Sequence, residues 1–431
     1  MSIVESFLEG VDTFVAWISS SVKQNNENYC DVQTVDSESV LVNHDGGLFS
    51  IIELKGAVAL IGHEEFERIH HGVLQSLGAT LSRPGHSIQV FFDYAKDDIH
   101  RAVEQNFDGS RKTAKRLNLT VDDLIDERID FLGRYCADER VFIVVYTHPT
   151  VLTKEQMKIA QKDKKKKMDS GEIPAFKYTQ NLYAAIPELR DTHQSLVRSV
   201  TSDLNSLSLS AKLLNARRAL KMMRCSVDKQ YTDQQWEAVI PGDQIKPKVA
   251  KSFRGDVSDI LWPSLAHQLM PRDAFVNDIK TCQIGDTLYA THYIDLFPKD
   301  IQPFQLLLNR TIDSKMPWRI SFLIDSGGLQ SLKMKRALSG ILSFASSQNR
   351  LINDAVNLLD YIDISTDDAV VGLRVCATTW APADQPSRLR SQSSMLGRAL
   401  QGWGSCDVSE VCGDPMEGNV ASMLAIKCDS P

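Results

Sequence analysis

The chain has 431 residues, of which 43% are hydrophobic and 24% charged, which is ordinary for a protein that folds around a core. Its formal net charge of −7 argues against a general nucleic-acid-binding surface, although a local basic patch is compatible with it. The cysteines form no C-x-x-C pair, and no run of residues approaches the roughly 20 apolar positions that cross a bilayer. We therefore expect a reduced, soluble, cytoplasmic protein of two or three domains.

Residues 1–28 are predicted to form an amphipathic helix followed by a polar linker. Apolar side chains recur at spacings of three and four, which is one face of an α-helix. They include Ile3, Phe7, Val11, Phe14 and Ile18. Two interpretations stay open: this face packs on the chain's own domain, or it docks onto a partner or a second copy. The acidic residues of the segment argue against an anionic membrane surface.

Residues 29–150 are predicted to form a first α/β subdomain. The turn Asp45-Gly46-Gly47 precedes an apolar, β-branched strand over 48–54. A helix over 64–77, a strand over 87–93, a long helical stretch over 97–136 and a strand over 141–148 follow. The long helical stretch has a weaker point near 107–109.

Residues 151–280 are predicted to be helix and loop, with 182–223 strongly helical. This region contains the basic run Lys162, Lys164, Lys165, Lys166 and Lys167. A solvated helix or loop face is one interpretation, and contact with phosphates, anionic lipid or an acidic partner is the other. No aromatic residue is interleaved, so base stacking is not supported.

Residues 281–431 are predicted to form a second α/β subdomain. Strands are expected over 287–296, 318–325 and 369–380, with a short helix over 300–311 and a long one over 329–361. The order β, short α, β, long α, β thus occurs in both subdomains. The predicted fold class is α/β (α+β), with two pattern-related subdomains around a helical middle region.

The sequence offers no recognisable catalytic set. A P-loop needs a Gly-Lys pair, which the chain lacks, and neither G-x-G-x-x-G nor G-x-S-x-G is present. His63, His70 and His71 are better explained as surface residues than as metal ligands. We therefore predict no catalytic, cofactor-binding or metal site in this chain, and we do not expect it to be an enzyme.

Several stretches carry a family resemblance. IGDTLYATHYIDLFPKDIQPFQLLLN and MPWRISFLIDSGG resemble the middle of type IV secretion and conjugation ATPases of the TraC/TraU/TrbE kind. DGGLFSIIELKG resembles an N-terminal strand of that family, and LGRALQGWGSCDVS resembles the passage before its P-loop domain. The layout over roughly residues 30 to 430 is most similar to the ATPase of Dot/Icm effector-secretion systems.

The resemblance implies an N-terminal docking and assembly portion of such an ATPase. It would lie on the cytoplasmic side of the inner membrane and tether the motor to inner-membrane secretion proteins. Its other partners would be further secretion ATPases and copies of itself, in a hexamer or a multiple of it. ATP and Mg would bind only a motor domain outside this chain. A free-standing enzyme and a nucleic-acid-binding adaptor stay open as alternatives.

Overall fold

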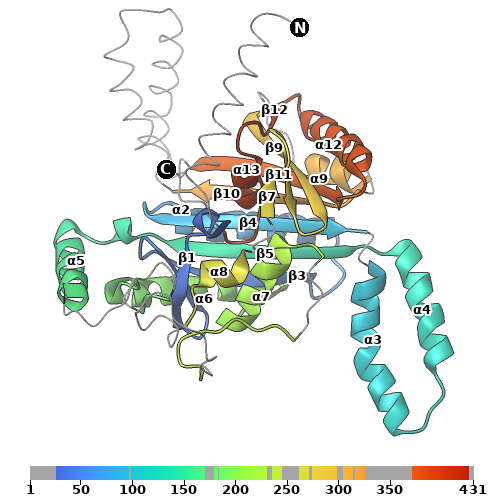
Figure 1. The fold of residues 1–431 in the computed structure, drawn as a ribbon, viewed down its shortest axis with the longest axis horizontal. Helices are drawn as coiled ribbons and strands as arrows, with labels where there is room; N and C mark the ends of the chain where they lie inside the picture. The colour runs from blue at the N-terminus through green and yellow to red at the C-terminus, as the bar shows by residue number, and fades with distance from the viewer. Residues whose placement is uncertain are drawn as a thin grey trace, which may run out of the picture.

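The computed structural model describes residues 26–96, 99–169, 179–182, 184–230, 235–244, 262–270, 274–298, 304–313, 316–326 and 371–426. Figure 1 shows this part of the chain as a mixed α/β fold built on one large sheet. The strands are β1 (Val32–Ser37), β2 (Val40–Asn43), β3 (Leu48–Ala57), β4 (His86–Ala95), β5 (Asp138–Thr147), β6 (Leu209–Leu213), β7 (Ala274–Val276), β8 (Thr281–Ile284), β9 (Thr287–Leu296), β10 (Trp318–Asp325), β11 (Gly372–Pro382) and β12 (Asp407–Glu410). The helices are α2 (His63–Leu81), α3 (Ile99–Arg116), α4 (Asp122–Tyr135), α5 (Lys154–Asp169), α6 (Pro187–Ser206), α7 (Ala216–Val227), α8 (Leu265–Leu269), α9 (Phe304–Asp313), α12 (Pro386–Gln401) and α13 (Pro415–Ala421), with 3-10 turns η1 (Asn26–Tyr29) and η2 (Pro149–Val151).

The strand order of the sheet is mirrored about its centre. Ten of the twelve strands of the described residues follow the order β1-β2-β3-β5-β4-β10-β11-β9-β8-β7, and each pairing is antiparallel. β6 pairs with the C-terminal part of β3, and β12 pairs with the C-terminal part of β9. The strands of 32–213 therefore lie on one side of the contact between β4 and β10, and those of 274–410 lie on the other.

The contact between β4 and β10 joins the two halves into one sheet. It runs along all of β10, from Trp318 opposite Tyr94 to Asp325 opposite Ser87. The Trp318 ring stacks on the rings of Phe92 and Tyr94 at centroid distances of 5.3 and 5.5 Å. Backbone pairing and aromatic packing thus bind the halves at the same place.

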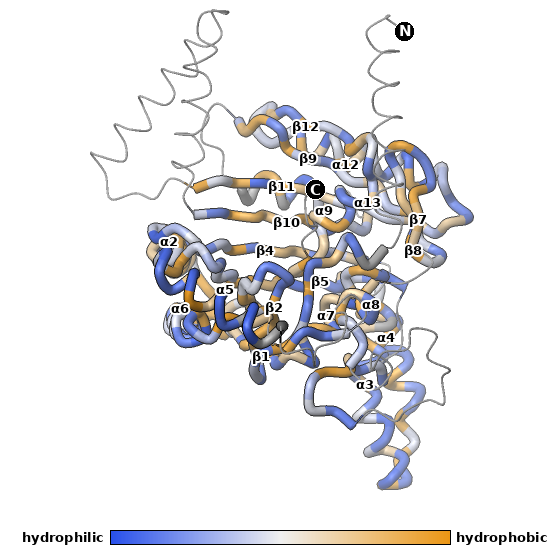
Figure 2. The backbone as a smooth tube through the Cα atoms, turned by 60° about the vertical axis from the view of Figure 1, so that its left-hand side comes forward, coloured by the Kyte–Doolittle hydropathy of each residue, from blue (hydrophilic) through white to orange (hydrophobic). Residues whose placement is uncertain are grey.

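Helices cover both faces of the sheet, because the side chains along each strand alternate between the faces. We call the face under α7, α8 and α13 the α7 face, and the face under α2, α6, α9 and α12 the α6 face. Phe91 and Phe142 point into the core of the α7 face, whereas Ile88 and Ile143 point into that of the α6 face. Figure 2 shows β11, β10 and β4 side by side in the sheet, which forms the middle layer.

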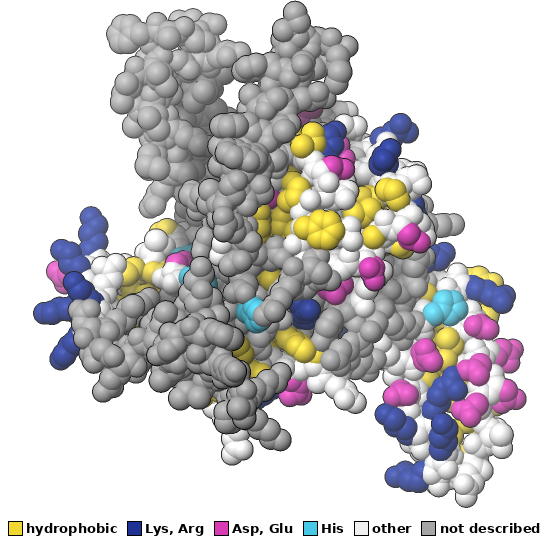
Figure 3. Space-filling model, viewed as in Figure 1, with side chains coloured by type: hydrophobic (Ala, Val, Ile, Leu, Met, Phe, Trp, Pro, Cys, Tyr) yellow, Lys and Arg dark blue, Asp and Glu magenta, His cyan; other side chains and the backbone are white. Residues whose placement is uncertain are grey.

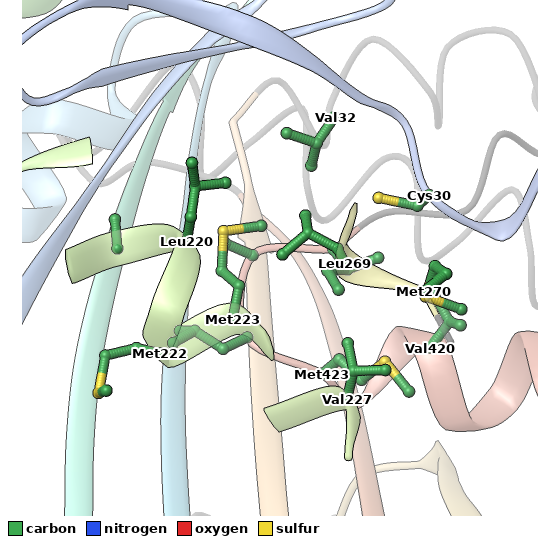
Figure 4. Close-up of a cluster of buried hydrophobic side chains, with 14 of the residues drawn as sticks. Cys30, Val32, Leu220, Met222, Met223, Val227, Leu269, Met270, Val420 and Met423 are labelled. Atoms are coloured by element: carbon green, nitrogen blue, oxygen red, sulfur yellow. The ribbon is translucent and has the colours of Figure 1, made fainter. Parts of the chain in front are cut away.

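The core of the α7 face contains side chains from both halves of the chain. Figure 4 shows methionines and aliphatic residues of α7, α8 and α13 packed against the start of β1. The residues labelled there are Cys30, Val32, Leu220, Met222, Met223, Val227, Leu269, Met270, Val420 and Met423. A shared core of this kind ties the folding of the two halves together.

Local sequence explains several of the element boundaries. Proline is the first residue of α6, α12 and α13, where its missing N–H leaves no unmet hydrogen bond. The predicted turn before β3 is present, with Gly46 at φ +88° and the Gly47 amide donating to Asp45 Oδ1 at 2.7 Å. A left-handed φ favours glycine at that position.

One helical hairpin, α3 and α4, projects from the body of the molecule (Figure 1). Its two helices pack on each other through a small core of their own, and we call this hairpin the arm. Its core residues are Ile99, Val103, Ile125 and Ile129, with Phe107, Val121 and Leu132 against them. Figure 2 also shows the arm standing apart from the sheet.

The predicted α/β class is confirmed in its coarse form, as a mixed fold on a large antiparallel sheet. The finer pattern of two β-α-β-long α-β subdomains stays a prediction, and the long helix over 329–361 lies outside the described residues. The stretch 182–223, predicted to be strongly helical, contains α6 and the start of α7, but the prediction missed β6 between them. The weaker point near 107–109 lies inside α3, and the helical stretch is instead interrupted between Arg116 and Asp122.

Candidate functional site

The predicted docking residues of the N-terminus cannot be placed. Ile3, Phe7, Val11, Phe14 and Ile18 lie outside the residues that the structure describes. Their role, and the helix that would carry them, stay predictions.

The predicted basic run lies on α5. A capping box starts this helix, in which the Thr153 amide donates to Gln156 Oε1 at 3.0 Å and the Gln156 amide donates to Thr153 Oγ1 at 3.3 Å. Lys162, Lys165 and Lys166 are exposed, while the side chains of Lys164 and Lys167 are not described. Figure 3 shows dark-blue side chains gathered over α5, at the left of the view.

A buried ion pair lies under the α7 face, at the seam between the halves. Lys229 follows α7, and its ammonium contacts the Asp93 carboxylate of β4. The same Nζ lies 4.6 Å from the centroid of the Trp380 ring, and the backbone N–H of Lys229 donates to Tyr289 Oη at 3.2 Å. Burial lowers the pKa of Lys229, and the neighbouring Asp93 charge opposes that shift.

Arg319 is a fully buried cation on β10, opposite Asp93 in the ladder. Its Nε donates to Ser422 Oγ at 2.8 Å, and its other nitrogens donate to the Ser226 carbonyl and to both oxygens of Asn419. Burial lowers the pKa of this guanidinium. The contacts join β10 to the end of α7 and to α13, so Arg319 connects elements of both halves.

The segment after α13 is fixed by the same cluster. Gln89 of β4 donates from Nε2 to the Met423 carbonyl at 2.8 Å and accepts at Oε1 from the Ala425 N–H at 2.8 Å. The Leu424 N–H donates to Ser226 Oγ at 3.2 Å. We call Asp93, Lys229, Arg319 and Gln89 with these partners the seam network. Most of its polar groups are held by protein partners, whereas Asp93 Oδ1 and Asn419 Nδ2 are buried without a hydrogen-bond partner. The many internal contacts favour a structural role for the network.

A buried histidine on α6 forms a second polar cluster. Ser50 Oγ donates to the Ser39 carbonyl at 2.7 Å, so it accepts from His193 Nε2 at 3.0 Å. His193 Nδ1 then accepts from Thr147 Oγ1 at 2.9 Å. Burial, assisted by His86, lowers the His193 pKa to about 4. Ser50 is therefore not poised as a nucleophile, because its proton is given to a carbonyl and the cluster is closed to solvent.

A cavity of about 270 Å³ opens on the α7 face beside the seam. Asp325, Glu417 and Arg374 line it together with Tyr146 and Tyr293. Burial raises the pKa of Tyr146 well above its usual range, so this phenol stays protonated. These side chains could surround a small polar molecule, but they do not pair a nucleophile with a base.

The described residues provide no metal centre. They contain no group of three or more His, Cys, Asp or Glu side chains that could hold an ion. Burial raises the pKa of Cys282 and of Cys376 to about 12, so these thiols stay protonated at neutral pH. Within the same ranges, no helix is long and apolar enough to span a bilayer.

Sequence reasoning missed the seam network. The available signal was Arg319, a charged residue within the apolar strand WRISFLID. Its partners lie about 100 residues away in sequence, at Ser226 and Asn419. Hydrogen bonds between residues so far apart in sequence depend on the tertiary fold, so sequence patterns alone do not predict them.

Comparisons with known proteins add no identification. No protein-family model matches this sequence, and no curated protein matches it. The resemblance to type IV secretion ATPases therefore stays a prediction.

Proposed function

We propose that the chain is the N-terminal docking and assembly portion of a type IV secretion ATPase, of the kind that serves Dot/Icm effector export. In this role it tethers the motor to inner-membrane secretion proteins on the cytoplasmic side. It also joins copies of itself into a hexamer or a multiple of six. ATP and Mg belong to the motor domain, and no residue of this chain is assigned to them.

The observation that carries the proposal is the arm on its sheet scaffold. The arm presents apolar side chains to solvent on α4, at Leu124, Phe131 and Tyr135, which are 62%, 52% and 75% exposed. Their spacings of seven and four place them on one face of the helix. Exposed apolar residues grouped on a projecting element are typical of protein–protein contact surfaces. The arm connects the end of β4 to the start of β5, two paired strands of the sheet, which give it a fixed base.

We assign the arm's exposed face to contact with a second copy of the chain. Analytical ultracentrifugation of the wild-type chain and of L124S/F131S/Y135S tests this assignment. We expect the wild type to form an oligomer whose mass falls to that of a monomer in the variant. The control V58S/L60S/L74S removes apolar residues that are also exposed, but on other elements, and it should assemble as the wild type does. A monomeric wild type, or an unchanged arm variant, would overturn the assignment.

Docking to the membrane complex is assigned to the N-terminal segment. Replacing Phe7, Val11 and Phe14 with Asp should abolish docking, because unpaired charges would be buried in the interface. The measurement is co-purification of the full-length ATPase with the inner-membrane proteins of the secretion complex. Undiminished co-purification would remove this assignment.

The mirrored strand order supports the idea of two pattern-related subdomains. Outward from the seam, β4, β5 and β3 in one half occupy the places of β10, β11 and β9 in the other. The hairpin partners β2 and β8, and the late strands β6 and β12, also correspond. We propose that the halves arose by duplication of one unit.

A further inference from the structure

The helix α5 has one face turned to the body and one turned to solvent. Met157, Ala160 and Gln161 line a cavity of about 280 Å³ together with Ile186 and Pro187, which precede and start α6. The cavity identifies the inward face of the helix. Figure 1 shows α5 at the edge of the molecule, so the opposite face is open to solvent.

The outward face of α5 is basic. Lys158, Lys162 and Lys165 are exposed at spacings of four and three, and Lys166 lies one turn after Lys162. No ion pair joins these lysines to an acidic residue within the described ranges. Ile159 lies among them and is 57% exposed. A chain with a net charge of −7 thus concentrates positive charge on one projecting helix (Figure 3).

We infer that the outward face of α5 binds the anionic phospholipid headgroups of a membrane surface. The lysine ammonium groups complement headgroup phosphates, and Ile159 supplies an apolar side chain that can enter the interface between headgroups and acyl chains. The long lysine stems allow the helix to lie flat on the surface while the charges reach the phosphates. This inference deepens the proposed function, because it rests on a location beside the inner membrane.

Lipid explains the face better than nucleic acid does. The face contains no aromatic residue on which a base could stack and no arginine with bidentate hydrogen-bond geometry. Ile159, exposed at the edge of the face beside Lys162 and Lys166, would find no apolar group to contact on a phosphodiester backbone.

Vesicle co-sedimentation tests the inference. The wild-type chain should pellet with vesicles of phosphatidylcholine containing roughly one-third phosphatidylglycerol, and not with phosphatidylcholine alone. Because each lysine near an anionic surface strengthens binding roughly fivefold, K158Q/K162Q/K165Q/K166Q should weaken it by at least about tenfold. Raising NaCl from roughly 0.05 to 0.5 M should release the wild type.

A matched control removes the same number of charges elsewhere. K55Q/K112Q/K115Q/R116Q changes exposed cations on β3 and α3, and it should bind vesicles as the wild type does. Equal loss in both variants would assign binding to net charge and overturn the α5 site. Unchanged binding by the α5 variant, or equal pelleting with neutral vesicles, would also overturn it.

Further measurements distinguish lipid binding by α5 from nucleic-acid binding and from loss of the fold. Duplex DNA that displaces the chain from the vesicles at equimolar phosphate would replace lipid by nucleic acid as the ligand. Far-UV circular dichroism shows whether the α5 variant keeps its fold. I159S is a second, milder variant, and we expect it to bind vesicles more weakly with an unchanged dependence on salt. Vesicle binding without self-assembly would reject the proposed function but keep the lipid site.

Discussion

The ammonium of Lys229 lies at the seam with its side chain 7% exposed, beside Asp93, whose side chain is 15% exposed. Removing one partner of such a pair leaves the other charge buried without compensation. We predict that Asp93→Ala lowers the free energy of unfolding by about 3–5 kcal/mol in urea titrations. The solvent-exposed pair of Asp108 and Lys112 is the control, and Asp108→Ala should cost no more than about 1 kcal/mol. Similar losses in both variants would contradict the structural role of the seam network.

His193 makes stability depend on pH. Its pKa falls from 6.5 to about 4 on folding, because burial disfavours the charged ring. Between these values the unfolded chain binds a proton that the folded chain does not, so stability falls as the pH decreases. We predict a loss of up to about 3 kcal/mol between pH 6.5 and 4 from this residue.

Thermal or urea unfolding as a function of pH measures that contribution. His193→Gln should reduce the dependence of stability on pH in this window. Part of that dependence should remain, because burial also lowers the pKa of nearby His86. His63→Gln, at an exposed position, should leave the slope unchanged. A wild-type chain that is more stable at pH 4.5 than at pH 6.5 would contradict the assignment.

The arm should unfold on its own, because its core is separate from that of the sheet. Ile125→Ala and Ile129→Ala each remove buried methyl groups and should cost about 2–5 kcal/mol locally. Hydrogen exchange should therefore accelerate in α3 and α4 while the amides of β4, β5 and β10 keep their protection. Leu119→Ala, at a position of the arm that is 56% exposed and outside its assembly face, is the control and should change little. Uniform acceleration across the sheet would show that the arm is part of one cooperative unit.

Element by element, the long strands were predictable and the short connections were not. β9 and β10 fall where the sequence places them, because their apolar, β-branched runs are bounded by clear turns. β6 was missed, since Ser206-Leu207-Ser208-Leu209 sits among helical residues. Ser208 follows α6 and has a left-handed backbone conformation, with φ +62°, which ends the helix. The spacing of apolar residues does not reveal such a change in backbone conformation.

The arm gives a similar lesson about helix breaks. Gly109 stays within α3, because one exposed glycine costs only about 1 kcal/mol in a helix. The break comes at Asn118, which has φ +54°, and the Leu119 amide bonds to the Ala114 carbonyl at 2.9 Å. Asparagine tolerates this left-handed conformation, so Asn118 was the residue in the sequence that indicated the end of the helix.

At the scale of the whole molecule, the mirrored sheet should unfold as one unit. The seam between β4 and β10 joins the halves through a full ladder, and the α7-face core draws on both. We predict that both halves of the sheet unfold in one calorimetric transition, apart from the local unfolding of the arm. Residues 29–230 and 262–426 expressed separately should each fail to fold, because β4 or β10 would become an unprotected edge. Separate transitions for the two halves of the sheet, or two independently folded halves, would contradict a single cooperative sheet.

The most direct test of the proposed docking and assembly role is to sequence the transcript downstream of codon 431. The proposal predicts an open frame that continues into G-x-x-x-x-G-K-[ST], the phosphate loop of the motor that this chain would tether. A stop codon directly after Pro431 would contradict the proposal and leave the scaffold without a motor in its own polypeptide.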